Sequence, residues 1–298
     1  MKLLTYRRAG AVRHGWLADD RTVGELGDGD LSTLLGTGTL AGSDRPAGWP
    51  AGQRYPLAEV EVLAPLLRPG KLLGVAANYQ DHVTESGAPP LDRSTLAPRL
   101  FLMPPTAIVG PDAPIPMPAV SDEIDWEAEL GVVIGRVARD VPVGTALDAV
   151  AGYCVANDVS ARSMRYGFAR DRDAAVTFFD WLAGKWLDGF APYGPWLVTA
   201  DEIGDPQDLT IELTVNGVTR QRGSTKDMIF SVAELVSFAS RLMTLEPGDV
   251  LMTGTPAGVG ATTGEFLAVG DEMTVRVEGL GSLTNRIVAA ARPGISQP

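Results

Sequence analysis

Residues 124–134 of the chain read IDWEAELGVVI, and this stretch decides which fold class the sequence favours. Its first half alternates apolar and acidic residues, which is typical of a β-strand whose successive side chains point to opposite faces. In such a strand Asp125, Glu127 and Glu129 share one face. The second half is wholly apolar, as expected for a strand inside the core. The stretch therefore predicts a strand that carries carboxylates into the interior.

The shared acidic face has two interpretations. Neighbouring carboxylates that enter a core repel one another and lose hydration, so without compensation at least one would be protonated. A divalent cation is the simplest compensation, and a set of oxygen ligands selects a hard ion such as Mg²⁺, Mn²⁺ or Ca²⁺. The alternative is an acidic strand edge that faces water. The spacing alone leaves both interpretations open.

The rest of the pattern beyond residue 70 is mostly strands and turns, which predicts an α+β fold that is mostly β. Regular alternation of strands and helices is missing, so a Rossmann fold or a TIM barrel is not expected. Residues 1–64 form a small N-terminal α+β unit in this interpretation, with a loop at 36–52, and residues 65–298 form the main domain. Local patterns predict strands at 71–77, 249–253, 272–277 and 282–289 and a short helix at 80–86. Asn216-Gly217 predicts a hairpin turn, and a capping box from Ser231 to Glu234 predicts the start of a helix that runs to about Leu245.

Composition excludes several classes of function. The 298 residues carry 25 basic and 37 acidic side chains, a net charge of −12, which disfavours binding to nucleic acid or to anionic membranes. A single cysteine rules out an intrachain disulfide, and two histidines exclude a His-rich metal site. The sequence shows neither a signal peptide nor an apolar run of about 18 residues, so we expect a cytoplasmic protein.

Three further places carry residues suited to chemistry. Asp158 follows an apolar run and precedes Ser-Ala-Arg, which predicts a strand-to-helix junction where Asp158 either binds a cation or caps the helix. His82 and Glu85 share a face of the short helix, where a carboxylate can orient an imidazole as a general base, although a lone histidine is more often structural. Lys185 lies among aromatic residues and prolines, either as a solvated cation or aimed into a pocket.

Together these segments resemble the fumarylacetoacetate hydrolase family over about residues 70–290. The matching stretches are 74–85, 124–135, 157–162, 184–199, 216–228 and 247–260. The resemblance implies a mixed β-roll core and a homodimer. It also implies a Mg²⁺ or Mn²⁺ site formed by Glu127, Glu129 and Asp158, with Ca²⁺ as a further candidate in vitro. The implied catalytic residues are His82, Glu85 and Lys185, and the implied substrate ligands are Arg162 and Thr255.

The family resemblance predicts a divalent-metal-dependent hydrolase that cleaves a C–C bond in a β-diketone or acylpyruvate-type acid. The alternatives are an oxaloacetate-type decarboxylase or tautomerase, a diketo sugar-acid hydrolase, and a non-catalytic carboxylate-binding protein. After Arg162 the family commonly continues Asp-x-Gln, whereas this chain has Ser163-Met164-Arg165. An arginine there adds a charged donor, so we predict that Arg165 also binds the substrate. Residues 168–179 match no motif.

Overall fold

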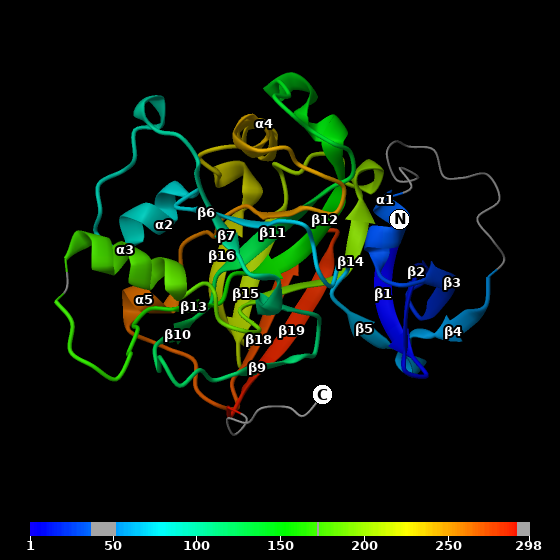
Figure 1. The fold of residues 1–298 in the computed structure, drawn as a ribbon, viewed down its shortest axis with the longest axis horizontal. Coiled ribbons are helices and arrows are strands. Elements are labelled where there is room, and N and C mark those ends of the chain that lie inside the picture. The colour runs from blue at the N-terminus through cyan, green and yellow to red at the C-terminus, as the bar shows by residue number, and fades with distance from the viewer. Residues whose placement is uncertain (37–51, 172, 291–298) are drawn as a thin grey trace.

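The computed structural model describes residues 1–36, 52–171 and 173–290 (Figure 1). Within these residues the chain forms a strand-rich α+β fold, as the sequence predicts, built on two main sheets and a short two-stranded sheet. Five helices lie around the sheets: α1 (Leu31–Gly36), α2 (Gln80–Glu85), α3 (Ala174–Ala183), α4 (Val232–Leu242) and α5 (Gly260–Thr263). Figure 1 shows α2, α3 and α5 gathered on one side and the N-terminal strands on the other.

The larger sheet has twelve strands among the described residues. Its main path runs β4-β3-β2-β1-β14-β12-β11-β17-β6-β7, and β5 and β8 join it at β1 and β14. The strands are β1 (Lys2–Arg8), β2 (Ala11–Asp19), β3 (Thr22–Asp28), β4 (Arg54–Pro56), β5 (Glu61–Leu63), β6 (Leu72–Ala76), β7 (Arg99–Met103), β8 (Ile108–Val109), β11 (Ala128–Ile134), β12 (Val150–Asn157), β14 (Ala191–Thr199) and β17 (Val250–Met252).

The second main sheet packs against the first. Its order is β16-β15-β18-β19-β9, and β12 and β14 contact β18 and β19 across the interface. The strands are β9 (Pro114–Pro116), β15 (Thr210–Val215), β16 (Val218–Ser224), β18 (Glu272–Val277) and β19 (Gly281–Val288). All seven residues of β11 are buried, because this strand lies between β12 and β17 and is covered by the second sheet. That position explains its continuous apolar sequence.

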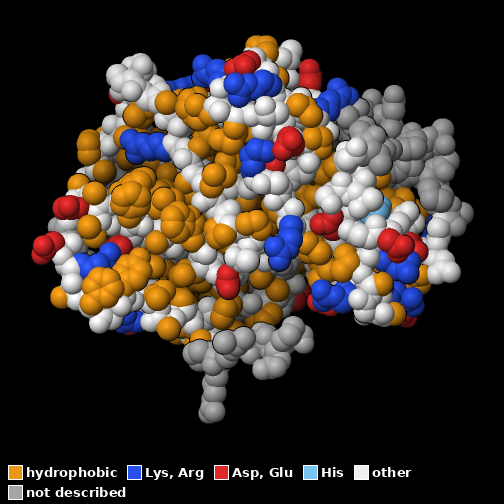
Figure 2. Space-filling model, in the orientation of Figure 1, with side chains coloured by type: hydrophobic (Ala, Val, Ile, Leu, Met, Phe, Trp, Pro, Cys, Tyr) orange, Lys and Arg blue, Asp and Glu red, His pale blue; other side chains and the backbone are white. Residues whose placement is uncertain are grey.

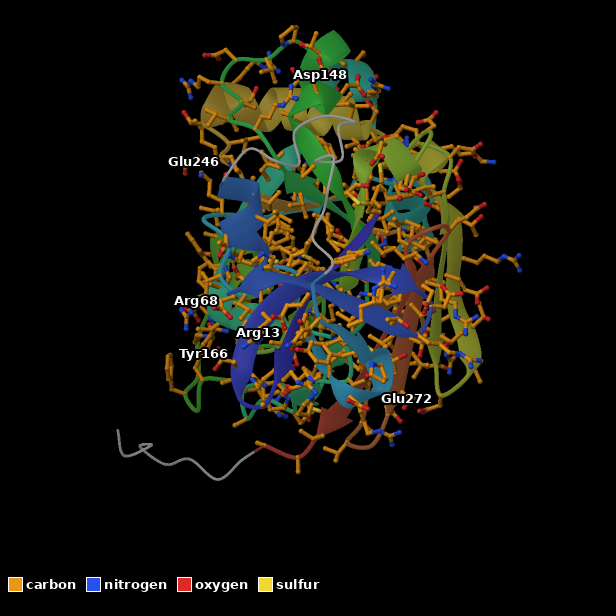
Figure 3. All side chains as sticks on the ribbon, turned by 90° about the vertical axis from the view of Figure 1, so that its right-hand side faces the viewer. Arg13, Arg68, Asp148, Tyr166, Glu246 and Glu272 are labelled. Carbon is orange, nitrogen blue, oxygen red and sulfur yellow. The ribbon has the colours of Figure 1, made fainter. Side chains whose placement is uncertain are left out.

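The N-terminal strands are joined to the main sheet through β1, which pairs with β14 at Lys2 and Leu3. Figure 3 looks onto this side and shows β1 and β2 crossing the front of the molecule. The division of the chain at residue 64 stays a prediction. The predicted loop at 36–52 lies almost wholly outside the described residues. No helix of the described residues is long and apolar enough to cross a membrane.

Several local predictions are confirmed. Strand β6 and helix α2 lie where the sequence places them, and Ser231 and Glu234 form the expected capping box at the start of α4. Asn216 and Gly217 have φ values of 50° and 77° between β15 and β16, which is the backbone of a type I′ turn. Helix α4 ends at Leu242, slightly earlier than predicted.

Two local predictions are wrong. The segment after Asp158 begins no helix, because Ser160–Ala161 forms strand β13 and pairs with β10 (Ile124–Asp125). The stretch 124–134 is not one strand either, since β10 and β11 are interrupted at Trp126 and Glu127. At this break the backbone N–H of Glu127 donates to the Asn157 side chain at 3.0 Å instead of to a strand neighbour.

Large apolar side chains are exposed around α3, on the face where Figure 2 shows extensive hydrophobic surface. We call this set the α3 patch; it comprises Leu102, Tyr166, Phe168, Phe178, Phe179 and Trp186. Ring contacts join Tyr166 to Phe168 and Phe178 to Phe179 within this patch. A group of exposed large apolar side chains of this kind is typical of an interface.

We predict that the chain forms a homodimer through the α3 patch. Light scattering at micromolar concentration should give the mass of two chains, and Phe179→Glu should shift it towards one chain, because a charge would be buried at the interface. Val218→Glu is the matched control, since Val218 is exposed on β16 of the other sheet. A wild-type monomer, or a dimer unaffected by Phe179→Glu, contradicts the prediction.

Candidate functional site

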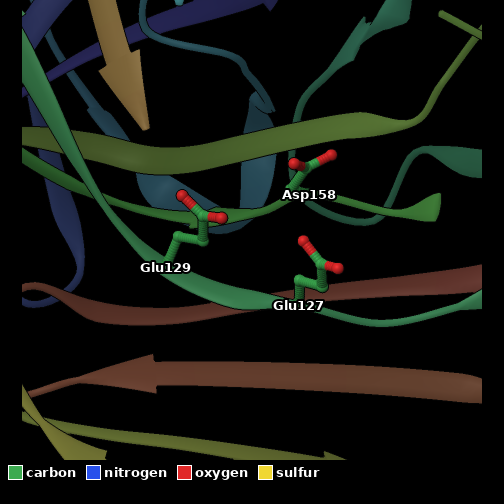
Figure 4. A group of neighbouring side chains, drawn as sticks. All are labelled: Glu127, Glu129 and Asp158. Atoms are coloured by element: carbon green, nitrogen blue, oxygen red, sulfur yellow. The ribbon is translucent and has the colours of Figure 1, made fainter. Parts of the chain in front are cut away.

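Three carboxylates meet where β11 and β12 lie side by side. Glu127 directly precedes β11, Glu129 is its second residue, and Asp158 directly follows β12. The antiparallel register pairs Ala128 with Asn157, which brings Glu127 opposite Asp158. One carboxylate oxygen from each residue lies within 4.8 Å of the others (Figure 4). The predicted ligand set is thus assembled in space, although no metal is part of the structure.

Burial is the largest single influence on the pKa of each of the three carboxylates, all of which are nearly inaccessible to solvent. Burial raises the pKa of Glu129 well above its ordinary value, and the charges of Asp158 and Glu127 raise it further. Burial likewise raises the pKa of Asp158, against the lowering influence of Lys185. For Glu127 burial acts in the same direction, but the charges of Lys185 and Arg162 outweigh it and lower the pKa.

Two cations, the buried Lys185 and the partly buried Arg162, hold this cluster together. Lys185 Nζ donates to Glu127 Oε2 at 2.7 Å and to Asp158 Oδ2 at 2.8 Å. Burial alone would lower the pKa of Lys185, but Asp158 and Glu127 raise it above its ordinary value, so the side chain is an ammonium. Arg162 donates from Nη2 to Glu127 Oε1 at 2.6 Å and from Nε to Asp125 Oδ2 at 2.8 Å.

The cluster carries an excess of negative charge that a divalent cation would neutralise. Four carboxylates (Asp125, Glu127, Glu129 and Asp158) stand against the two cations Arg162 and Lys185. If all are ionised, two negative charges remain, which is the charge a divalent ion supplies. Asp158 Oδ1 is also buried with no hydrogen-bond partner among the described residues. A carboxylate oxygen without a partner in the core is costly, so the residues present fit a hard cation.

Asp125 does not belong to the group of three predicted ligands, although the sequence places it on one strand face with Glu127 and Glu129. Its Oδ1 accepts the backbone N–H of Gly260 at 2.6 Å, and its Oδ2 accepts that of Ala261 at 2.9 Å. Together with the bond to Arg162, these contacts make Asp125 an anchor between β10 and α5. The local spacing gave no signal for this role, because the partners are about 135 residues away in the chain.

His82 and Glu85 form the predicted pair on α2. His82 Nδ1 lies 2.7 Å from Glu85 Oε1, and Glu85 Oε2 accepts the backbone N–H of Gly258 at 2.7 Å. Gly258 has a φ of 106°, and a Cβ there would lie 2.2 Å from the carbonyl oxygen of Arg220, so only glycine fits this position. The loop after β17 therefore fixes the carboxylate that orients His82.

Thr255 belongs to the same loop and is buried. Its Oγ1 accepts a hydrogen bond from Gln221 Nε2 at 2.8 Å, and Gln221 Oε1 accepts the backbone N–H of Ala128 at 2.8 Å. Gln221 thereby connects the loop to the strand that carries Glu129. Sequence reasoning missed Gln221, because a glutamine in a polar strand resembles any solvent-facing residue.

One cavity of about 460 Å³ joins most of these residues. Its polar lining comes from His82, Glu127, Asp158, Arg162, Lys185 and Thr255. Arg99 also lines the cavity. The apolar lining consists of Val75, Ala76, Ala77, Leu100, Phe101, Phe178 and Trp181. Two of these residues, Phe178 and Trp181, come from α3, within or next to the stretch that matched no motif.

Arg165 is not among the residues that line this cavity. Its exposed guanidinium donates to Asp122 Oδ2 at 2.7 Å, and its backbone N–H donates to Val120. The structure thus places Arg165 on the surface, whereas Arg162 and Thr255 line the cavity. Its role in substrate binding stays a prediction that this position does not favour.

Residues 71–288 match the family model described as fumarylacetoacetate (FAA) hydrolase C-terminal. That match covers most of the chain and includes every residue of the cluster. The chain belongs to the fumarylacetoacetate hydrolase family. Among curated relatives, Protein Rv2993c of Mycobacterium tuberculosis is 41% identical over 254 residues, which are 84% of this chain and 88% of that protein.

Solved structures of the family carry different names. A fumarylacetoacetate hydrolase from Exiguobacterium antarcticum has a TM-score of 0.79 and 35% identity, and covers 97% of this chain and 99% of its own. A protein titled 5-carboxymethyl-2-hydroxymuconate delta-isomerase, from Mycobacterium smegmatis, has a TM-score of 0.75 and 36% identity, with 97% and 100% covered. The chain is therefore similar over nearly its whole length to both hydrolases and isomerases of the fumarylacetoacetate hydrolase family.

We predict that Asp158→Asn lowers the affinity for Mn²⁺ by more than about tenfold, because the amide loses the charge that the cluster needs. Isothermal titration of the protein with Mn²⁺ measures the affinity, and Mn²⁺ should raise the Tm of the wild type but not of the variant. Asp122→Asn is the matched control, since Asp122 is exposed and pairs only with Arg165. Equal Mn²⁺ affinity in the wild type and Asp158→Asn would remove Asp158 from the ligand set.

Proposed function

We propose that the chain is a divalent-metal-dependent hydrolase that cleaves a carbon–carbon bond in a β-diketone or acylpyruvate-type acid. The observation that carries the proposal is that His82, oriented by Glu85, lines the same cavity as Glu127, Asp158 and Lys185. A positioned base, a buried ammonium and a cation-binding carboxylate set are the groups that hydrolysis of a 1,3-dicarbonyl requires.

The metal site and Arg162 would bind the oxygen atoms of the substrate. Glu127, Glu129 and Asp158 would hold Mg²⁺ or Mn²⁺, which when bound polarises carbonyl oxygens of the substrate. Arg162 lines the cavity, and among the described residues only its Nε and Nη2 have partners, Asp125 and Glu127, which leaves further N–H donors for a ligand. A planar guanidinium in this position suits the carboxylate of a keto acid.

His82 and Glu85 would activate the water. When Nδ1 carries the proton and donates it to Glu85, Nε2 is left as the proton acceptor. His82 then takes a proton from water, and the resulting hydroxide adds to the carbonyl carbon that is distal to the substrate carboxylate. Glu85 cannot swing away, because Gly258 holds its other oxygen.

Lys185 would stabilise the negative charge that develops. An ammonium has three donors, and two of them are used by Glu127 and Asp158, so one remains for the substrate oxygen. When the C–C bond breaks, its electron pair passes into the enolate of the leaving fragment. The proton held by His82 balances the step by protonating that enolate to a ketone, such as pyruvate, while the other fragment leaves as an acid.

Isomerisation on the same scaffold is the second candidate, because solved relatives are titled as isomerases. A tautomerase or an oxaloacetate-type decarboxylase needs the cation and Lys185 but activates no water. The two reaction types therefore differ in how much they depend on His82. Activity assays with and without Mg²⁺ distinguish them, with acylpyruvates, oxaloacetate and diketo acids as substrates.

We predict that His82→Ala lowers kcat for C–C hydrolysis by about 10²–10⁴-fold, with metal affinity and KM nearly kept, because a positioned base acts in the transition state. Glu85→Gln should lose less, since Glu85 orients the base and does not accept the first proton. Steady-state kinetics on acylpyruvates measure both effects. His14→Asn is the control, because His14 is the chain's other histidine and lies on β2.

Full hydrolase activity in His82→Ala would contradict the assignment of the base. Activity on oxaloacetate alone, unaffected by His82→Ala, would replace the proposed hydrolase with a decarboxylase or tautomerase.

A further inference from the structure

Trp126 lies at the break between β10 and β11, between the anchor Asp125 and the predicted metal ligand Glu127. Its side chain is buried, with 3% of its surface exposed. The indole Nε1–H donates to the carbonyl oxygen of Gly258 at 3.0 Å. This hydrogen bond joins the acidic segment to the loop after β17, so the indole makes a polar contact in addition to its packing in the core.

Gly258 is held from two sides. Its carbonyl oxygen accepts the Trp126 indole N–H, and its own backbone N–H donates to Glu85 Oε2 at 2.7 Å. Glu85 Oε1 in turn lies 2.7 Å from His82 Nδ1. A series of hydrogen bonds thus runs from the indole, through one glycine and one carboxylate, to the imidazole.

The backbone of Gly258 has no side chain to restrain it. Its φ of 106° lies in the region that favours glycine, and a Cβ there would collide with the carbonyl oxygen of Arg220. Glycine also has more backbone freedom than any other residue. Trp126 on one side and Glu85 on the other therefore supply the restraint that a side chain would otherwise give.

The neighbouring residue Asp125 holds the rest of the same loop. Its two carboxylate oxygens accept the backbone N–H groups of Gly260 and Ala261. Asp125 and Trp126 thus both contact the loop, whereas the next residue, Glu127, lines the cavity. Three consecutive residues therefore connect the predicted metal site to the loop that orients the predicted base.

We propose that Trp126 is a positioning residue for His82. Its indole N–H holds Gly258, and Gly258 in turn holds Glu85. The imidazole thereby keeps the tautomer that donates from Nδ1 and leaves Nε2 as the proton acceptor. This inference rests on the proposed function for the role of His82 as the base. Trp126 acts through other groups, since it is not one of the described residues that line the cavity.

The test observes the ring nitrogens of His82 directly, which is feasible because the chain has two histidines. Proton–nitrogen correlation NMR spectra of the isotope-labelled protein with saturating Mg²⁺ record both rings, and His14→Asn identifies the signals of His14. Protonated and unprotonated ring nitrogens differ in chemical shift by far more than a neighbouring aromatic ring can cause. At about pH 8.5, where an ordinary imidazole is neutral, wild-type His82 should show a protonated Nδ1 and an unprotonated Nε2.

Trp126→Phe removes the indole N–H and keeps an aromatic ring in the core. The His82 ring of this variant should show both tautomers, because Glu85 is no longer fixed. Trp196→Phe is the matched control and should leave the His82 ring unchanged. Trp196 Nε1 is buried without a hydrogen-bond partner among the described residues, so the same truncation removes no such bond.

A second variant separates the loss of the hydrogen bond from the loss of packing. A tryptophan analogue with a sulfur atom in place of the indole N–H, introduced in place of Trp126, keeps the size and shape of the ring. It should change the His82 ring as Trp126→Phe does, and it gives the reading even if the smaller phenylalanine prevents folding.

The same series of contacts should appear in the kinetics. Trp126→Phe should lower kcat about tenfold with KM and Mn²⁺ affinity nearly kept, as expected for a buried acceptor left without its donor. In a Glu85→Ala background the series is already broken, so adding Trp126→Phe should change kcat by less than about twofold. A residue that only fills the core would lower the Tm without this dependence on Glu85.

A His82 ring that keeps the wild-type tautomer in both Trp126 variants would overturn the assignment. A wild-type ring without a proton on Nδ1, or an equal loss of kcat with and without Glu85, would overturn it as well. These outcomes are distinct from failure of the proposed function. If no diketo acid is cleaved, the hydrolase proposal fails, while the ring spectra still decide whether Trp126 positions His82.

Discussion

The burial of four carboxylates in one cluster is the constraint on which the rest of the site depends. Asp125, Glu127, Glu129 and Asp158 are withdrawn from water, and each would be costly to keep ionised alone. Arg162 and Lys185 offset part of this cost by spanning the cluster from two sides. A divalent cation would offset the remainder, so the architecture has an energetic reason to bind one. Removal of either basic side chain would leave the cluster with too much negative charge to stay folded in its present form.

The strand that carries the acidic residues is interrupted between β10 and β11, at Trp126 and Glu127. Where β10 gives way to β11, the strand ladder is broken, and side chains supply the missing hydrogen bonds. Asn157 accepts the N–H of Glu127, and Gln221 accepts that of Ala128. The register of β11 and β12 places Glu127 opposite Asp158, and the break leaves the Glu127 N–H to Asn157 instead of to a strand neighbour. Lys185 donates to both carboxylates at this point. The buried amides are thus part of the site, although they do not line the charged end of the cavity.

Sequence reasoning succeeded where the deciding interactions are local. The hairpin at Asn216 and the capping box at Ser231 depend on residues a few positions apart, and the pairing of His82 with Glu85 needs only one helical turn. The helix expected after Asp158 failed because β13 is specified by its pairing with β10, far away in the chain. The acidic pattern indicated Asp125, Glu127 and Glu129 alike, and only the family resemblance selected Glu127 and Glu129 and joined Asp158 and Lys185 to them in one site.

The two arginines, Arg162 and Arg99, show what a sequence cannot decide. The family resemblance indicated Arg162 as a substrate ligand, whereas no pattern in the sequence indicated Arg99. The structure assigns them opposite situations, because Arg162 is held by two buried carboxylates while Arg99 faces the cavity without a partner among the described residues. Arg162 therefore could not be replaced without disturbing the cluster, whereas no ion pair among the described residues ties Arg99 to it.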